Sequence, residues 1–167
     1  GAGFESEFRL GPHVKFNPEI DYDNERFAQK HSVTTRFDKL TFRTETRDID
    51  SHFETLIGAP SRRGEKGTLF DMTANPFENV NLSGTFDIFR DRLIPNPSNA
   101  EGYNTHTDLL LRMIPRERSS LLFTFQDLDD TGRLGPNKQR TFGAQFNQQF
   151  EIFGHKTSGF SRYQWTE

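Results

Sequence analysis

The chain contains no cysteine, which excludes disulfides, thiolate metal sites and cysteine nucleophiles together. It also lacks any run of the ~20 apolar residues that a membrane-spanning helix requires. Its charges of both signs are interspersed around a net charge of −3, with no basic block, so nucleic acid is not an expected partner. These absences narrow the classes of site and partner but leave the fold open.

Hydrophobic residues as a whole are scarce, whereas one aromatic residue is abundant. The hydrophobic fraction of 32% is low for a globular protein and by itself would suggest disorder. Eighteen Phe residues argue against disorder, because a solvated chain has no use for that many large apolar rings. Many aromatics at low mean hydropathy fit a β-sheet with one apolar and one polar face.

Apolar and polar residues alternate with a period of two, as they do in strands whose two faces differ. The longest run extends from Phe8 to Tyr22, and Pro12 and Pro18 predict that this strand is irregular or lies at an edge. We therefore predict an all-β, antiparallel up-and-down meander, forming a transmembrane β-barrel or a segment of one. Residues 1–167 would make a single domain of about eight or nine strands. Further alternating runs lie at 33–37, 40–47, 80–88, 105–113, 121–125, 141–152 and 157–166.

The connections between these runs alternate between short and long. Short turns are predicted at 37–39, 75–79, 115–119 and 154–156, about 39 residues apart. Longer polar loops are predicted at 58–67, 94–104 and 129–138. Outer-membrane barrels have short periplasmic turns and longer extracellular loops, so this alternation favours such a barrel.

Charge interrupts the apolar face at Asp48, Arg90 and Asp127, each toward the loop end of its strand. A charge costs ~2–4 kcal/mol at a bilayer midplane but roughly 0–1 kcal/mol near the interface. The pattern therefore predicts an apolar belt near the turns and a wet rim near the loops. The expected lipid-facing residues are Val80, Leu82, Phe86, Phe123, Phe125, Phe142, Phe146 and Phe150. The expected lumen-facing residues are Arg9, Lys15, Arg36, Arg43, Glu45, Arg47, Asp87, Arg112 and Glu151.

The segment Asn-Pro-Phe-Glu-Asn-Val-Asn-Leu-Ser-Gly-Thr-Phe-Asp at 75–87, followed by a long loop rich in Pro and Asn, resembles large bacterial outer-membrane porin-like barrels. The likeness covers most of residues 31–166 as architecture. It implies a bacterial outer-membrane location, membrane lipid as a neighbour, and a role as a diffusion channel or a sheath around a periplasmic electron carrier. The C-terminal Trp165-Thr166-Glu167 departs from the terminal aromatic of such barrels. With the start at Gly1 this predicts further barrel strands or partner subunits.

No set of residues indicates an enzyme or a cofactor. Asp127 and Asp129 open like a calcium-binding loop, but Lys138 stands where a bidentate Glu is required, so calcium is only a weak candidate beside an acidic turn. The five histidines are scattered singly, which gives no metal-ligand spacing. Ser119 lacks the Gly-x-Ser-x-Gly context of a hydrolase nucleophile. We therefore expect a pore, conduit or scaffold with a polar, charged lumen, and no catalytic residue or metal.

A soluble alternative remains open at this level. A lipocalin-like up-and-down barrel would turn the Phe-rich face inward around an apolar ligand and leave the charges outside. An enzyme with its site on the rim of a barrel is a third possibility, for which no catalytic set is visible. Composition does not separate the first two, because both need one apolar and one polar face.

Overall fold

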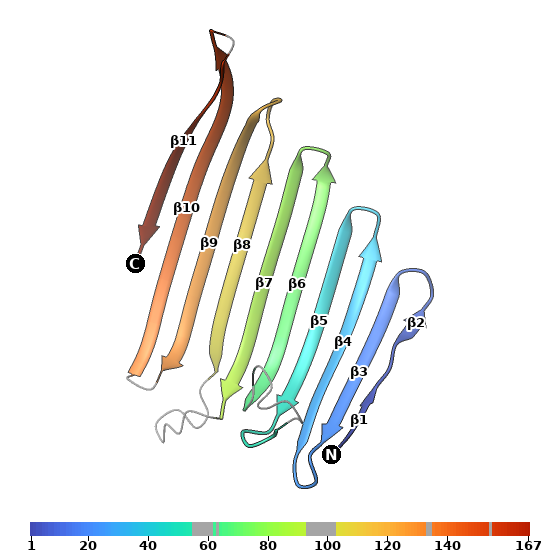
Figure 1. The fold of residues 1–167 in the computed structure, drawn as a ribbon. Helices are drawn as coiled ribbons and strands as arrows, with labels where there is room; N and C mark the ends of the chain where they lie inside the picture. Colours follow the sequence, from blue (N-terminus) through green and yellow to red (C-terminus); the bar gives the residue numbers. More distant parts are fainter. Residues whose placement is uncertain (55–61, 63, 93–102, 133–134, 154) are drawn as a thin grey trace.

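The computed structural model describes residues 1–54, 62, 64–92, 103–132, 135–153 and 155–167. They form one antiparallel sheet without helices (Figure 1). Accordingly, these residues include no helix that is long and apolar enough to cross a membrane. The strands are β1 (Ala2–Glu5), β2 (Phe8–Leu10), β3 (Val14–Tyr22), β4 (Phe27–Phe37), β5 (Leu40–Ile49), β6 (Glu65–Phe77), β7 (Val80–Asp91), β8 (Asn104–Met113), β9 (Ser119–Gly132), β10 (Gly135–Ile152) and β11 (His155–Thr166).

The strands follow the chain in space. The order across the sheet is β1-β3-β4-β5-β6-β7-β8-β9-β10-β11, and β2 also pairs with β3. The predicted all-β antiparallel meander is therefore confirmed. The sheet is not closed, because among the described residues β11 pairs only with β10, and β1 and β2 pair only with β3.

The predicted continuous strand from Phe8 to Tyr22 is wrong. Gly11 adopts a φ of 74°, a left-handed conformation that suits glycine, and it turns the chain between β2 and β3. Those two strands form a hairpin, and β1 continues along the other end of β3. Pro18 has no N–H to donate, which interrupts the ladder between β1 and β2, although the Ser6 N–H still donates to the Pro18 carbonyl at 3.2 Å. The proline thus lies in β3, and β1 and β2 form the edge.

Other features of the sheet also differ from the sequence prediction. The loop predicted at 129–138 is instead largely strand, since β9 extends to Gly132 and β10 begins at Gly135. Strand β6 was not among the alternating runs, because Leu69 lies on the polar face and Thr68 on the apolar one. The count is eleven strands rather than eight or nine. Of the loop predicted at 58–67, residues 58–61 and 63 lie outside the described residues, and residues 65–67 belong to β6. Most of the loop predicted at 94–104 and one residue of the turn at 154–156 also lie outside the described residues.

The other short turns occur where the sequence predicted them. Strand β4 ends at Phe37 and β5 begins at Leu40, and β6 ends at Phe77 before β7 begins at Val80. Residues 114–118 connect β8 to β9. In Figure 1 the short-turn ends climb from the β4–β5 hairpin to the β10–β11 hairpin, so the sheet has a stepped upper edge.

Among the described residues, the sheet is a single layer without a second layer packed on either face as a whole. Its accessible surface is 11903 Å², whereas a compact monomer of this mass exposes about 8,500 Å² by the usual scaling. Soluble domains bury the apolar face of a sheet against another layer. The excess surface agrees with the lack of such a layer in the part of the chain that the structure describes.

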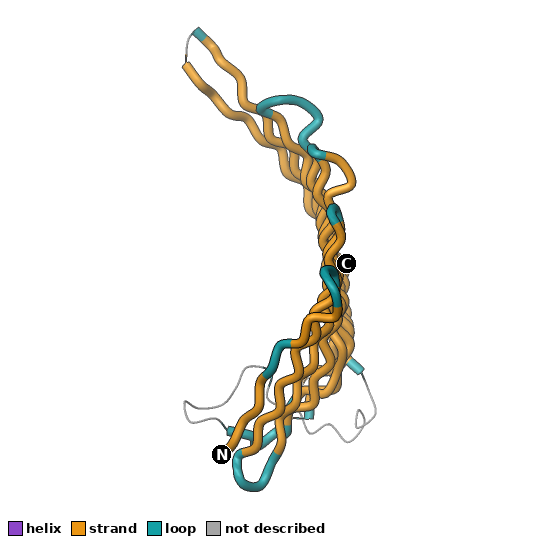
Figure 2. The backbone as a smooth tube through the Cα atoms, turned by 90° about the vertical axis from the view of Figure 1, so that its right-hand side faces the viewer, coloured by secondary structure: helices purple, strands orange, loops and turns teal. Residues whose placement is uncertain are grey.

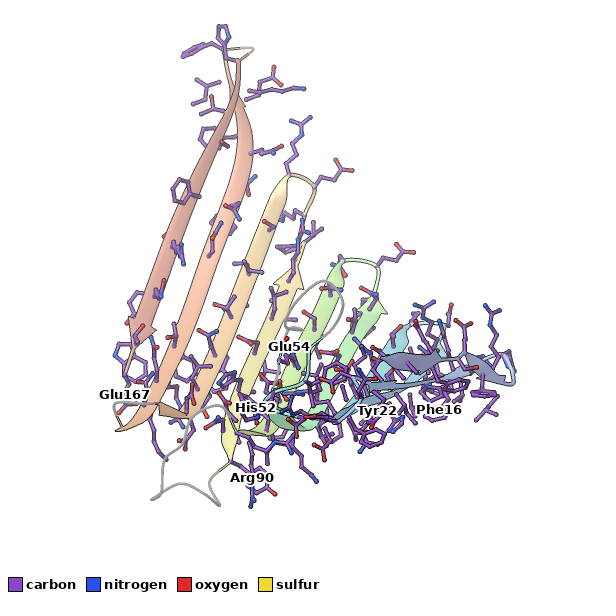
Figure 3. The ribbon with its side chains drawn as sticks, turned by 60° about the horizontal axis from the view of Figure 1, so that its bottom comes forward. Phe16, Tyr22, His52, Glu54, Arg90 and Glu167 are labelled. Atoms are coloured by element: carbon purple, nitrogen blue, oxygen red, sulfur yellow. The ribbon has the colours of Figure 1, made fainter. Side chains whose placement is uncertain are left out.

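The sheet is curved, and its two faces differ in chemistry. Seen edge-on in Figure 2, it forms an arc with a concave and a convex side. In Figure 3, Phe16, Tyr22 and Arg90 lie on one side of the sheet and Glu54 on the other. Comparing the two views places the apolar face on the convex side and the polar face on the concave side.

Candidate functional site

The strand register determines which residues share the convex face, because directly paired residues point to the same side of a sheet. One row of paired residues crosses from Phe42 on β5 through Leu109 and Phe125 to Phe142 and Trp165 on β11. The same face carries every residue that the sequence assigned to lipid: Val80, Leu82, Phe86, Phe123, Phe125, Phe142, Phe146 and Phe150.

Aromatic rings stack along this convex face. The Phe70 ring centroid lies 6.4 Å from that of Phe42 and 6.2 Å from that of Phe86. The Phe142 centroid lies 4.9 Å from that of Phe125 and 5.7 Å from that of Trp165. All four distances fall in the range of favourable ring pairs. Yet Phe42 is 40% exposed and Phe142 is 42% exposed, so these ring contacts leave a large part of each side chain uncovered.

A charged border limits the apolar face toward the loops. Three ion pairs on this border bridge neighbouring strands: Asp48–Lys66 at 2.9 Å, Asp127–Arg140 at 3.0 Å and Asp129–Lys138 at 2.6 Å. The Arg90 guanidinium lies 4.4 Å from the centre of the Tyr103 ring, a cation–π contact. The charges that interrupt the apolar pattern are thus at one end of the convex face and have local partners.

This border and the short-turn ends both climb across the sheet. We count along each strand from the row that contains Phe42 and Phe142 toward the loops. The first charged residue of the convex face lies six residues away on β5, β6 and β7 but two residues away on β9 and β10. At the opposite end, Phe37 of β4 is two residues beyond the row and Ile152 of β10 is ten beyond it. This climb of eight residues over six strands corresponds to a strand tilt of about 40°, taking ~3.4 Å per residue and ~4.8 Å between strands.

The concave face carries all the residues that the sequence assigned to the lumen. Arg9 pairs with Lys15, and Glu45 and Asp87 both pair with Leu69, so these charges share one side. The register places the whole set there: Arg9, Lys15, Arg36, Arg43, Glu45, Arg47, Asp87, Arg112 and Glu151.

A network of ion pairs centres on Arg47. Its side chain is 0% exposed, and its Nη2 lies 2.7 Å from a Glu65 carboxylate oxygen and 2.9 Å from one of Asp87. Arg62 also donates to Asp87, at 3.2 Å. Alongside, Arg43 pairs with Glu45. Buried charges of this kind offset their desolvation through partners, and removing one partner typically costs about 3–5 kcal/mol.

The segment after β5 covers part of the concave face beside Arg47. Phe53 in this segment is 3% exposed and packs with Ala28 and Ile49 on the concave face. The Glu54 N–H donates to Asp23 Oδ2 at 3.0 Å, and this bond holds the pKa of the Asp23 carboxyl below its usual value. Sequence analysis missed this cover. The signal that would have indicated a covering segment is an apolar residue, such as Ile49, at a strand position where the alternation calls for a polar one.

A shallow hollow lies farther along the concave face, across β7 to β11. Its volume is about 400 Å³, and its concave-face lining includes Ser83, Thr85, Asp108, Thr124, Gln126 and Arg162. The sequence analysis singled out none of these six, because they come from four different strands and share the hollow only through the register.

The residues proposed from calcium-like spacing lie on a strand and not in a loop. Asp127 and Asp129 occupy alternate positions of β9 and face the convex side, where Arg140 and Lys138 pair with them. In the part of the chain that the structure describes, no group of three or more His, Asp or Glu side chains is placed to hold a metal ion.

Comparison with known proteins adds no relative: the chain matches no protein-family model, no curated protein and no solved structure.

Proposed function

We propose that this chain is wall material of a bacterial outer-membrane β-barrel that acts as a pore, conduit or scaffold. Its convex apolar face contacts lipid, and its concave polar face borders a water-filled lumen. The observation that carries the proposal is the single-layer sheet with apolar residues on its convex side. A bilayer supplies the apolar surroundings that a second protein layer would supply in a soluble domain.

The direction of curvature favours this proposal over a soluble ligand-binding barrel. A lipocalin-like barrel encloses its ligand with an apolar concave face. Here the concave face carries Arg43, Glu45 and Arg47, while Phe86 and Phe142 lie on the convex face. A sheet that closed along its present curvature would therefore enclose charges and expose rings.

Strand length and tilt also support a membrane wall. Strands β3 to β11 have between 9 and 18 residues each, and a tilted membrane strand needs ~9–11 residues. The tilt of about 40° from the climbing turn ends lies within the ~35–45° of outer-membrane barrels. The charged border climbs in the same direction, which leaves an apolar belt between border and turns.

The open edges imply further pairing in a membrane. Unpaired N–H and C=O groups cost several kcal/mol each in lipid, so an open sheet is not viable there. The outer edges of β1–β2 and of β11 therefore pair with each other, with another copy, or with additional strands. We favour additional strands or partner subunits, because the described sheet is a gentle arc (Figure 2).

Flotation with lipid vesicles tests the proposal. Protein that is refolded in detergent and transferred to vesicles should float with the lipid and resist extraction at high pH. The parallel sample in aqueous buffer without detergent should aggregate, since the convex rings lack cover. A monodisperse 19.4 kDa monomer in buffer alone would contradict the proposal.

A further inference from the structure

One wall of the hollow on the concave face is a row of paired residues. The paired residues Ser83, Leu110, Thr124, Gly143 and Gln164 follow one another across β7 to β11. Gly143 has no side chain, and a Cβ at this position would lie 2.3 Å from Thr124 Oγ1. Thr124, which lines the hollow, therefore occupies the space that a side chain at position 143 would need.

The next row toward the loops supplies the opposite wall. It runs through Thr85, Asp108, Gln126 and Thr141. The Gln126 amide donates to Asp108 Oδ1 at 2.9 Å, which orients both side chains. Asp108 has a second carboxylate oxygen and Gln126 has a carbonyl oxygen, so this pair contains further acceptors.

Donors come from the C-terminal wall. Arg162 on β11 donates to Gln164 Oε1 at 2.9 Å, which leaves the Gln164 NH₂ group and other guanidinium N–H groups as chemical donors. The lining therefore combines hydroxyls, amides, one carboxylate and one guanidinium. Its formal charge is neutral, since Asp108 and Arg162 offset each other.

Such a lining suits a neutral ligand with several neighbouring hydroxyl groups. Each hydroxyl of a sugar both donates and accepts, so it can use carboxylate, amide and hydroxyl partners at once. A neutral lining offers no net attraction to an ion. The volume of about 400 Å³ lies within the ~300–1,000 Å³ of small-molecule sites. Leu110 adds an apolar contact for the C–H face of a ring.

We infer that this hollow is a binding site for a neutral saccharide, held between the Asp108–Gln126 pair and the Arg162–Gln164 pair. Binding itself needs only the concave face. The further role of the site, as a station for a sugar crossing the lumen, rests on the proposed function.

Ligand-observed NMR tests the inference. Saturation transfer from the full chain to maltose and to trehalose is measured in a detergent without a sugar headgroup, with gluconate and glucosamine as anionic and cationic comparators. The variants are Asp108→Ala and Gln126→Ala, both at exposed positions. Gln149→Ala is the matched control, because it makes the same amide-to-alanine change on the same face at the other end of β10.

The inference predicts that a neutral sugar binds the wild type and the control equally. Each of the other two variants should weaken binding about three- to tenfold, the effect of one or two lost hydrogen bonds. Absence of saturation transfer to either neutral sugar would overturn the inference, and so would equal binding by all variants or binding confined to a charged comparator. The NMR experiment does not depend on flotation. A failure of the flotation test would therefore count against the membrane proposal alone.

Discussion

At the scale of single residues, the alternation assigned side chains to one of two faces but did not predict their contacts. Arg47 and Phe146 were both assigned to a face from the period of two, and the register places them on opposite faces. The burial of Arg47 was not predictable, because its partners Glu65 and Asp87 come from other strands and Phe53 packs over the same face after β5. Local periodicity contains no information on such a cover.

Replacing Phe146 with Arg tests the convex face at one position. Phe146 lies in the middle of the apolar run on β10, so the charge should cost ~2–4 kcal/mol of stability in vesicles. Gln145→Arg introduces the same residue on the concave face next to it and should cost less than about 1 kcal/mol. Urea unfolding of both variants in lipid gives the two values. Equal losses would show that lipid does not contact Phe146.

Replacing Arg47 with Ala tests the ion-pair network. The change leaves Glu65 and Asp87 without their shared guanidinium and should destabilise the protein by about 3–5 kcal/mol. Arg36→Ala removes an exposed arginine from the neighbouring strand and should change stability by about 0.5 kcal/mol at most. The comparison is made by urea unfolding in detergent. A loss at Arg47 no larger than at Arg36 would contradict the role of the network.

At the scale of elements, strands were predicted where alternation is regular and missed where another constraint interrupts it. The sequence did not show that Gly11 would turn the chain, since the alternation continues through that residue. It did not reveal β6 because Leu69 is an apolar residue on the polar face and Thr68 is a polar residue on the apolar face. The loop predicted at 129–138 is polar because its charges pair across β9 and β10. Polarity alone does not distinguish that hairpin from a loop.

The segment after β5 should be held by Phe53. Phe53→Ala removes its packing against Ala28 and Ile49, so the Glu54 amide should exchange with solvent faster than in the wild type. Phe153→Ala is the control, because that ring is 98% exposed and should leave the exchange rate unchanged. Hydrogen exchange followed by NMR measures both. Unchanged protection of Glu54 in the Phe53 variant would show that Asp23 alone holds the segment.

Asp23 should make this attachment depend on pH. Its folded pKa is lowered, first by the bond from the Glu54 N–H, so the carboxylate stabilises the folded state above the ordinary value of 3.8. That contribution is lost as pH falls through the lowered folded pKa. The stability difference between the wild type and Asp23→Asn should therefore be present at neutral pH and vanish in acid. A difference that does not change with pH would contradict the assignment.

At the scale of the whole molecule, the open sheet and its curvature decide the functional argument. The sequence predicted a barrel segment that needs further strands or subunits, but it did not show the direction of curvature, because curvature is a property of many strands together. If further strands or subunits complete the wall, the protein part of the detergent-solubilised particle should exceed 19.4 kDa. Light scattering corrected for bound detergent measures this mass. A particle containing one 19.4 kDa chain would show instead that the edges at β1–β2 and β11 close on each other.

The most direct test of the central claim is a scan of lipid contact along β9. The chain has no native cysteine, so single cysteines at positions 121 to 125 can each carry a fluorophore. In vesicles, quenchers attached to lipid chains should quench the labels at positions 121, 123 and 125, and a water-soluble quencher should reach those at 122 and 124. Alternation in this phase is the predicted result. Quenching without alternation, or with the two phases exchanged, would contradict the assignment of lipid to the convex face.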